Sequence, residues 1–180
     1  MGMTLYVARH GQTEWNVDWR ICGRTDVELT EVGRAQAQAM AQQAKEAGIE
    51  LILASPLKRA QDTAKAAAEA CGAPILTDER LIEMNYGSFE GKSGNDPEFA
   101  AARRQFGVRF PGGESLLDVA ARVYPLLDEV RRTYAGKKVL LVCHGGVCRV
   151  LRTYFTGMTN DEMMGYYAAN ATLMRYEYAD

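Results

Sequence analysis

Short β-rich apolar runs alternate with helical patterns along this chain, and this alternation restricts the possible folds more than any other feature. Five strands are expected, at residues 3–8, 49–54, 74–77, 137–143 and 171–178. Strands that alternate with helices are typical of βα units and of a largely parallel sheet. The sequence therefore predicts an α/β fold, a three-layer α/β/α sandwich with a mostly parallel central sheet.

The segments between the strands carry apolar residues at helical spacing, apart from one long segment without a regular pattern. Helices are expected around Met40, around Ala64 and over a longer stretch near Val123 that includes Pro125. Residues 86–113 form an irregular excursion, and loops of this length are often functional. The sequence therefore predicts one domain over residues 1–180, with an excursion or lid at about 86–113.

Composition and charge limit the classes of protein to which the chain can belong. Its 180 residues are 47% hydrophobic, and the net charge is −2 with dispersed Lys and Arg, so no nucleic-acid partner is expected. The four cysteines show no C-x-x-C pair, which favours packed, reduced thiols over a structural zinc site. No stretch has the pattern of a secretion signal or a membrane span, so we expect a cytoplasmic protein that does not enter membranes.

Basic and imidazole side chains follow three of the predicted strands at the point where each strand ends. The segments are Arg9-His10-Gly11-Gln12-Thr13, Ser55-Pro56-Leu57-Lys58-Arg59 and His144-Gly145-Gly146. Ligands of an open α/β sheet bind at the carboxyl ends of its strands, where helix N-termini present unpaired N–H groups. The sequence therefore predicts that the three segments converge on one anion site.

The second segment is the stronger indication of an anion. Ser55 is expected to cap a helix whose first residue is Pro56, which puts Lys58 and Arg59 in its first turn. The helix dipole disfavours cations at that end by about 0.3 to 1 kcal/mol, so a negative group is expected nearby. Taken singly, Arg59 could instead extend to solvent over an apolar surface.

Phosphoryl transfer to a nitrogen nucleophile is the chemistry that best uses these residue types. A neutral imidazole, with an ordinary pKa of about 6.5, is better suited than an anion to attack a phosphate dianion. Arginine supplies charged, bidentate contacts to the phosphate oxygens, and a second histidine supplies a further hydrogen bond. The leaving alkoxide then needs a proton from a carboxylic acid.

Arg9-His10-Gly11, with Asn16 a turn later, resembles the R-H-G signature of the histidine phosphatase superfamily, which is phosphoglycerate-mutase-like. Further segments resemble that family in order and nearly to the end of the chain. They are Cys22-Gly23-Arg24-Thr25-Asp26, Ser55-Pro56-Leu57-Lys58-Arg59-Ala60, Leu81-Ile82-Glu83-Met84-Asn85-Tyr86-Gly87, Pro111-Gly112-Gly113-Glu114-Ser115 with Arg122, and His144-Gly145.

The resemblance, carried over by position, implies a role for each matching residue. His10 would be the nucleophile, and Glu83 the proton donor and later the base, with Glu114 as the reserve candidate. The phosphate pocket would be formed by Arg9, Arg59 and His144. Further substrate contacts are predicted at Asn16, Gly145, Gln12, Cys22 and Gly23. Neither a metal nor a cofactor is expected.

Phosphatases and mutases of this family share the phosphohistidine and differ in what accepts the phosphoryl group. Family mutases tend to carry a longer insertion before the G-E-S segment, whereas only residues 92–110 fill that gap here. The resemblance therefore favours a metal-independent phosphatase that hydrolyses a small phosphate monoester. The alternatives are a cofactor-dependent phosphoglycerate mutase and a non-catalytic binding module on the same fold; the substrate and the oligomeric state stay open.

The excursion mixes aromatic residues with cations. If it covers the pocket, it could hold the organic part of the substrate or a second acidic group. Its three arginines could equally form the solvated face of a lid helix. The residues concerned are Phe99, Arg103, Arg104, Phe106, Arg109 and Phe110.

Overall fold

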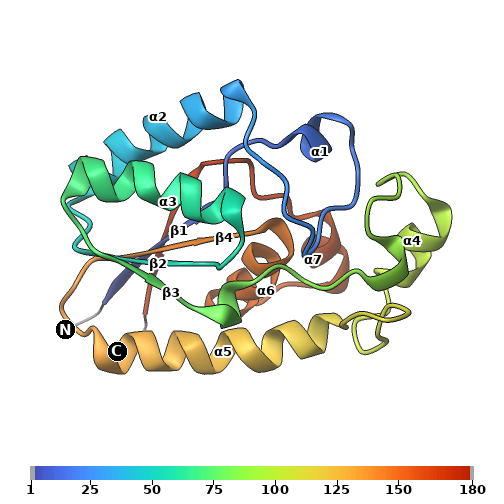
Figure 1. Ribbon diagram of the computed structural model, residues 1–180. Helices are drawn as coiled ribbons and strands as arrows, with labels where there is room; N and C mark the ends of the chain where they lie inside the picture. The colour runs from blue at the N-terminus through green and yellow to red at the C-terminus, as the bar shows by residue number, and fades with distance from the viewer. Residues whose placement is uncertain (1–2, 179–180) are drawn as a thin grey trace.

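The computed structural model describes residues 3–178, which form a five-stranded sheet with helices on both faces (Figure 1). The strand order is β3-β2-β4-β1-β5, with β5 antiparallel to β1 and the other neighbouring pairs parallel. The predicted mostly parallel α/β sandwich is confirmed, and each strand lies within two residues of its predicted bounds. The strands are β1 (Thr4–Arg9), β2 (Leu51–Ala54), β3 (Ile75–Thr77), β4 (Val139–Cys143) and β5 (Leu173–Glu177).

Two helical layers cover the sheet with different kinds of side chain. On one face, α2 (Glu31–Ala47) and α3 (Lys58–Cys71) pack largely through alanines, together with Met40 and Leu140. On the other face, α5 (Leu116–Thr133) and α6 (Gly145–Phe155) pack through larger residues such as Leu127 and Leu141. Successive residues of β4 alternate between the two clusters because side chains of a strand point to opposite faces. This central strand is therefore buried on both sides.

The short helices gather beyond the carboxyl ends of the parallel strands (Figure 1). They are α1 (Glu14–Val17), α4 (Pro97–Ala102) and α7 (Asn160–Gly165), and two 3₁₀ turns lie at Glu79–Leu81 and Gly87–Phe89. The long helix α5 continues past Pro125 to Thr133. The helices that cover the sheet therefore lie apart from the segments that surround the strand ends.

Four aromatic rings organise the excursion at residues 86–113. Neighbouring ring centroids among Tyr86, Phe89, Phe99 and Phe110 lie 5.6 to 5.7 Å apart, in tilted, edge-on and stacked arrangements. Aromatic pairs at such distances stabilise a fold beyond the area that they bury. The segment has little regular structure, as predicted, yet the apolar ring cluster holds it in place.

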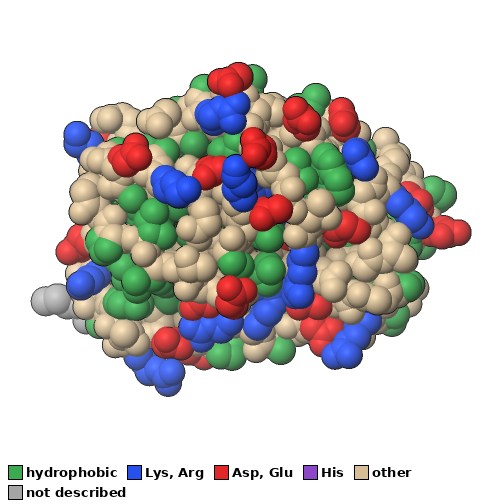
Figure 2. Space-filling view, in the orientation of Figure 1, with side chains coloured by type: hydrophobic (Ala, Val, Ile, Leu, Met, Phe, Trp, Pro, Cys, Tyr) green, Lys and Arg blue, Asp and Glu red, His purple; other side chains and the backbone are tan. Residues whose placement is uncertain are grey.

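Acidic and basic side chains are interspersed over the face of the molecule shown in Figure 2. The four cysteines are free thiols, as predicted, and Cys143 and Cys148 are buried. Among residues 3–178, no helix is both long enough and apolar enough to span a membrane.

Candidate active site

The three segments singled out in the sequence leave the same edge of the sheet. Strand β4 lies between β1 and β2, so the carboxyl ends of these three strands are neighbours. The N–H of His10 donates to the Cys143 carbonyl at 3.0 Å, and the N–H of Ser55 donates to the Val142 carbonyl at 3.0 Å. The predicted convergence is therefore present in the backbone itself.

His10 is held as a neutral imidazole with a defined reactive nitrogen. Its Nδ1 lies 2.7 Å from the carbonyl of Gly11 and donates to it, so the lone pair is on Nε2. Nε2 accepts a hydrogen bond from Arg59 Nε at 3.2 Å. Burial, and then the positive charges of Arg59 and Arg9, hold the pKa of His10 well below its usual value of about 6.5. This nitrogen is therefore unprotonated at neutral pH, with a lone pair that could act as a base or nucleophile.

Arg59 is fully buried and links the nucleophile to the loop that follows α1. Its Nη1 donates to the Thr25 carbonyl at 2.9 Å, and its Nη2 donates to the Gly23 carbonyl at 2.6 Å. A guanidinium has five N–H donors in a fixed plane, so these two bonds leave the guanidinium fixed in position beside His10. The two carbonyl oxygens compensate part of the cost of burying the guanidinium charge. The Nε–H group of the same guanidinium points at His10.

The helix that carries Arg59 begins later than predicted. The residue at its N-cap is Leu57, without a side-chain capping bond, and Lys58 is the first helical residue. The prediction of Ser55 as the cap is wrong, since Pro56 and Leu57 are not helical; the Ser55 hydroxyl instead lies between the N–H of Leu57, at 3.3 Å, and His144 Nε2, at 2.6 Å. The negative group expected near the first turn is present, since Asp26 Oδ1 accepts from the N–H of Lys58 at 2.8 Å.

Of the two ring nitrogens of His144, Nε2 forms a hydrogen bond and Nδ1 has no partner in the part of the chain that the structure describes. Ser55 Oγ accepts from the N–H of Leu57 at 3.3 Å, which leaves its own hydrogen for His144 Nε2. In that arrangement the imidazole proton is on Nδ1, a buried donor with no partner among the described residues. Burial, followed by the charge of Arg59, lowers the pKa of His144 well below its usual value, so the ring is neutral. A neutral ring with a free N–H suits an oxygen acceptor.

Arg9 also presents a buried donor that nothing in residues 3–178 accepts, its Nε. Its Nη1 donates to the Ala168 carbonyl at 2.9 Å, and its guanidinium lies over the ring of Tyr167, 5.1 Å from the centroid. A buried unpaired donor costs about 1 to 3 kcal/mol. Two such donors, on Arg9 and on His144, whose ring centroid lies 5.1 Å from that of His10, indicate a site built for an anion with several oxygens.

The carboxylate of Glu83 is buried and fixed by two backbone N–H groups. Its Oε1 accepts from Met84 N–H at 2.7 Å, and its Oε2 accepts from Gly146 N–H at 3.0 Å. A Cβ added to Gly146 would lie only 2.6 Å from Oε1, so a side chain there would displace the carboxylate. The glycine after Gly145 is therefore what allows Glu83 to approach the start of α6.

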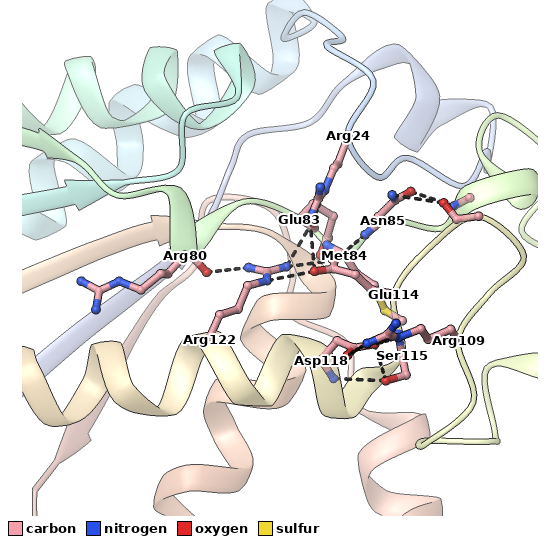
Figure 3. Close-up of polar contacts among 12 residues, drawn as sticks. Arg24, Arg80, Glu83, Met84, Asn85, Arg109, Glu114, Ser115, Asp118 and Arg122 are labelled. Carbon is pink, nitrogen blue, oxygen red and sulfur yellow. Dashed lines mark hydrogen bonds and ion pairs between the residues drawn. The ribbon is translucent and has the colours of Figure 1, made fainter.

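A second carboxylate, Glu114, lies behind Glu83 and is saturated with donors (Figure 3). Its Oε1 lies 3.1 Å from Arg24 and 3.3 Å from Arg122, and its Oε2 accepts from the N–H of Asn85 at 2.8 Å. Arg122 also donates to the carbonyl of Arg80. Glu114 thus joins the loop that holds Arg59 to the segment that carries Glu83, and its position favours Glu83 over Glu114 as the proton donor.

A cavity of about 180 Å³ opens in front of these groups. Of the predicted residues, Arg9, His10, Asn16, Cys22, Glu83 and Gly145 line it. Arg59 and His144 are fully buried behind its wall. Burial raises the pKa of the Cys22 thiol to about 11, so this sulfur stays protonated.

Two predicted substrate contacts lie outside the residues that line the cavity. The side chain of Gln12 accepts from the Thr30 hydroxyl at 3.0 Å, and Gly23 offers its carbonyl to Arg59. Gln12 therefore stabilises the start of α2, and the Gly23 carbonyl holds Arg59 in position. Direct substrate contact stays a prediction for both.

Sequence reasoning missed several residues that support the site. Thr63 Oγ1 accepts from the N–H of Gly11 at 3.0 Å, and Asn170 Nδ2 donates to the carbonyl of His10 at 2.9 Å. Arg149, on the fifth position of α6, lines the cavity. Thr63 falls one helical turn after Arg59, a spacing that could have indicated it; Asn170 and Arg149 carry no comparable signal.

The comparison with known proteins agrees with this arrangement. The sequence model of the histidine phosphatase superfamily (branch 1) matches residues 5–180. The chain belongs to the histidine phosphatase superfamily. The resemblance seen in the ordered motifs is thus confirmed, and the chain contains all five side chains that were predicted to be catalytic.

Relatives of this chain include proteins named as phosphatases and a protein named as a probable mutase. A protein of Yersinia pestis (strain Pestoides F) named "Probable phosphoglycerate mutase GpmB" is 37% identical over 99% of this chain and 86% of its own length. The structure of a mycobacterial glucosyl-3-phosphoglycerate phosphatase in complex with VO3 is similar with a TM-score of 0.86 and 33% identity, over 96% of this chain and 90% of that one. The alpha-ribazole phosphatase of Shigella flexneri is similar with a TM-score of 0.83 and 26% identity, over 96% and 89%.

Proposed function

We propose that this histidine phosphatase is a metal-independent phosphatase that hydrolyses a small phosphate monoester through a phosphohistidine at His10. The observation that carries the proposal is the Nε2 lone pair of His10, which lies among two unpartnered buried donors, on Arg9 and His144, and the guanidinium of Arg59. A cavity of about 180 Å³ is smaller than the roughly 300 to 1,000 Å³ of drug-sized sites, which favours a small ester.

In the first step, Nε2 of His10 attacks phosphorus while the bond from phosphorus to the ester oxygen breaks. Arg9, Arg59 and Nδ1–H of His144 donate to the phosphoryl oxygens, whose charge they stabilise. The departing alkoxide takes the proton of the Glu83 carboxylic acid and leaves as an alcohol. The product is the phosphoenzyme with Glu83 as a carboxylate.

In the second step, the Glu83 carboxylate takes a proton from a water molecule whose oxygen attacks phosphorus. The phosphorus–nitrogen bond breaks, and its electron pair returns to Nε2 of His10. Inorganic phosphate leaves, His10 is again neutral, and Glu83 again carries its proton. Each residue thus returns to its starting state without a metal ion or a cofactor.

The short segment between Lys92 and Phe110 supports water as the acceptor of the phosphoryl group. The second candidate function is that of a phosphoglycerate mutase, because one relative has that name. A mutase would return the phosphoryl group of His10 to a bound phosphoglycerate instead of releasing it. Release of phosphate and isomerisation are therefore the two outcomes that separate the candidates.

A panel of small phosphate monoesters, scored for released phosphate in the presence of a chelator, tests the function. We expect turnover by the wild type, none by His10→Ala, and no conversion between 2- and 3-phosphoglycerate. Rapid quenching with a labelled ester is expected to trap an acid-labile phosphoryl group on His10. A label on serine or aspartate, or isomerisation without phosphate release, would contradict the proposal.

A further inference from the structure

Besides Arg9, the cavity is lined by arginines that the reaction at His10 does not use. Arginine is the prevailing charged residue among those that line the cavity in the described chain, and Glu83 is the only carboxylate there. Glu83 is already occupied by backbone N–H groups. The arginines that line the cavity are Arg9, Arg20, Arg103 and Arg149.

Arg103 and Arg149 both bond to the backbone of the chain that precedes β5. Arg103 Nη2 donates to the Met164 carbonyl at 3.3 Å, and Arg149 Nη2 donates to the Tyr166 carbonyl at 3.0 Å. Neither arginine forms an ion pair with any residue between 3 and 178. The two guanidinium groups are therefore anchored by carbonyl oxygens, and their charges are not neutralised.

The cost of this arrangement is visible in each residue. Burial, and then the charge of Arg149, lower the pKa of Arg103. Arg149 Nε is buried and has no acceptor among the described residues. Both arginines are half-buried, and two like charges that line one cavity repel each other. A protein keeps such a pair where a negative ligand compensates it.

The neighbouring arginines of the excursion provide the contrast. Arg104 is exposed and lies 3.4 Å from Asp161, and Arg109 is exposed and lies 2.7 Å from Asp118. Only Arg103, which packs over the ring of Phe99 at 5.8 Å from its centroid, turns into the cavity. Of the three arginines, Arg103 therefore lines the cavity, whereas Arg104 and Arg109 are exposed to solvent.

Tyr86 connects this region to the reaction centre. The charges of Glu83, Arg149, Arg103 and Arg9 all act on its hydroxyl, which is buried. A Cβ added to Gly146 would lie 3.1 Å from that hydroxyl, so the tyrosine stands directly beside the start of α6. His10, Arg103 and Arg149 line the same cavity of about 180 Å³, so one small substrate can contact all three.

We propose that Arg103 and Arg149 form a subsite for a second anionic group, a carboxylate or a second phosphate, on the alcohol part of the substrate. Both groups present oxygens that guanidinium binds in a bidentate manner. This subsite rests on the proposed function and names its substrate class, a small phosphate ester with another negative charge. Neutral esters of the same size would leave the two half-buried cations of the cavity wall uncompensated.

Matched substrate pairs test the subsite. The pairs are 3-phosphoglycerate with glycerol 3-phosphate, and fructose 1,6-bisphosphate with fructose 6-phosphate, compared by kcat/KM for phosphate release. We expect the wild type to prefer the more anionic member of at least one pair by about 10- to 100-fold, in line with hydrogen bonds to charged groups. The pair with the larger ratio distinguishes a carboxylate from a second phosphate.

Arg103→Gln and Arg149→Gln are each expected to reduce that preference by about tenfold or more. Arg104→Gln, at the next position in the chain, is the matched control and is expected to keep the wild-type ratio. If Arg149→Gln proves unfolded by circular dichroism, Arg103→Gln alone decides. A wild type without preference in either pair, or a preference that survives both substitutions, would overturn the subsite.

The failure of the subsite and the failure of the proposed function give different results. An enzyme that hydrolyses p-nitrophenyl phosphate through His10 but shows no preference for anionic esters lacks the subsite alone. A protein that releases no phosphate from any ester, or whose His10→Ala variant stays active, fails the proposed function. We expect inorganic phosphate to bind the site at His10 and not the subsite, so the wild type and Arg103→Gln should bind it equally.

Discussion

Arg59 Nε lies 3.2 Å from His10 Nε2, and the same guanidinium holds the carbonyls of Gly23 and Thr25. One buried side chain therefore fixes the loop after α1, aims a donor at the reactive nitrogen and disfavours protonation of the imidazole. The first two of these effects depend on the planar arrangement of several N–H donors. The charge alone would reproduce only the last.

Arg59→Lys tests this dependence on geometry. Lysine keeps the positive charge but cannot make both carbonyl bonds and also point at His10, so kcat/KM should fall by about 10²- to 10³-fold. The measurement is steady-state phosphate release. Arg34→Lys, at an exposed arginine on α2, is the control and should change kcat/KM by less than about twofold. A fully active Arg59→Lys enzyme would refute the assigned role.

Glu83→Gln removes the proposed proton donor and leaves the shape of the side chain nearly unchanged. Esters with a poor leaving group, such as glycerol 3-phosphate, should lose about 10²- to 10⁴-fold in kcat, because their alkoxide needs a proton. An activated aryl ester such as p-nitrophenyl phosphate should lose far less. The ratio of the two losses is the measurement.

Glu114→Gln is the companion variant, because Glu114 touches Arg24, Arg122 and Asn85 rather than the cavity. It should affect both kinds of ester equally, through a displaced Glu83. If Glu114→Gln shows the leaving-group dependence and Glu83→Gln does not, the proton donor is Glu114.

The sequence predicted those parts of the site that local patterns encode. Strands β1, β2 and β4 are apolar runs in the sequence. The polar residues that follow each run were therefore predicted to lie at one edge of the sheet. The contact of the Ser55 hydroxyl with His144 was missed because the two residues are 89 positions apart in the sequence. Arg149 was missed because an arginine on an amphipathic helix is ordinarily solvated. Arg149 lines the cavity together with residues of the excursion, such as Arg103, which are distant from it in the sequence.

The two imidazoles should stay neutral where ordinary histidines gain a proton. Burial and the nearby arginines hold the pKa values of His10 and His144 well below 6.5. The chain has only two histidines, so ¹⁵N spectra of the histidine-labelled protein report both without overlap. Between pH 7 and pH 5.5, in phosphate-free buffer, neither should titrate, whereas both should titrate near 6.5 in urea. An imidazole of the folded protein that titrates at 6.5 or above would contradict the site electrostatics.

The same shifts make stability depend on pH in a defined direction. Below about pH 6.5 the unfolded chain binds protons at both histidines, and the folded chain does not. The free energy of unfolding that these two groups contribute is therefore complete above about pH 6.5 and decreases as the pH falls toward the folded pKa values. Urea unfolding at pH 7, 6 and 5 measures this trend; a free energy that rises as the pH falls through this window would contradict it.

Ser55→Ala tests whether His144 acts as a neutral donor to phosphate. The Ser55 hydroxyl lies 2.6 Å from His144 Nε2, and its hydrogen there leaves the imidazole proton on Nδ1. Without the hydroxyl, the ring can place its proton on Nε2 and turn an acceptor toward the phosphate oxygens, so kcat/KM should fall by about 10- to 100-fold. Ser55→Thr retains the hydroxyl and should restore most of the activity, provided that its methyl group fits. Equal losses in both variants would indicate that packing at residue 55, rather than the hydrogen bond, supports His144.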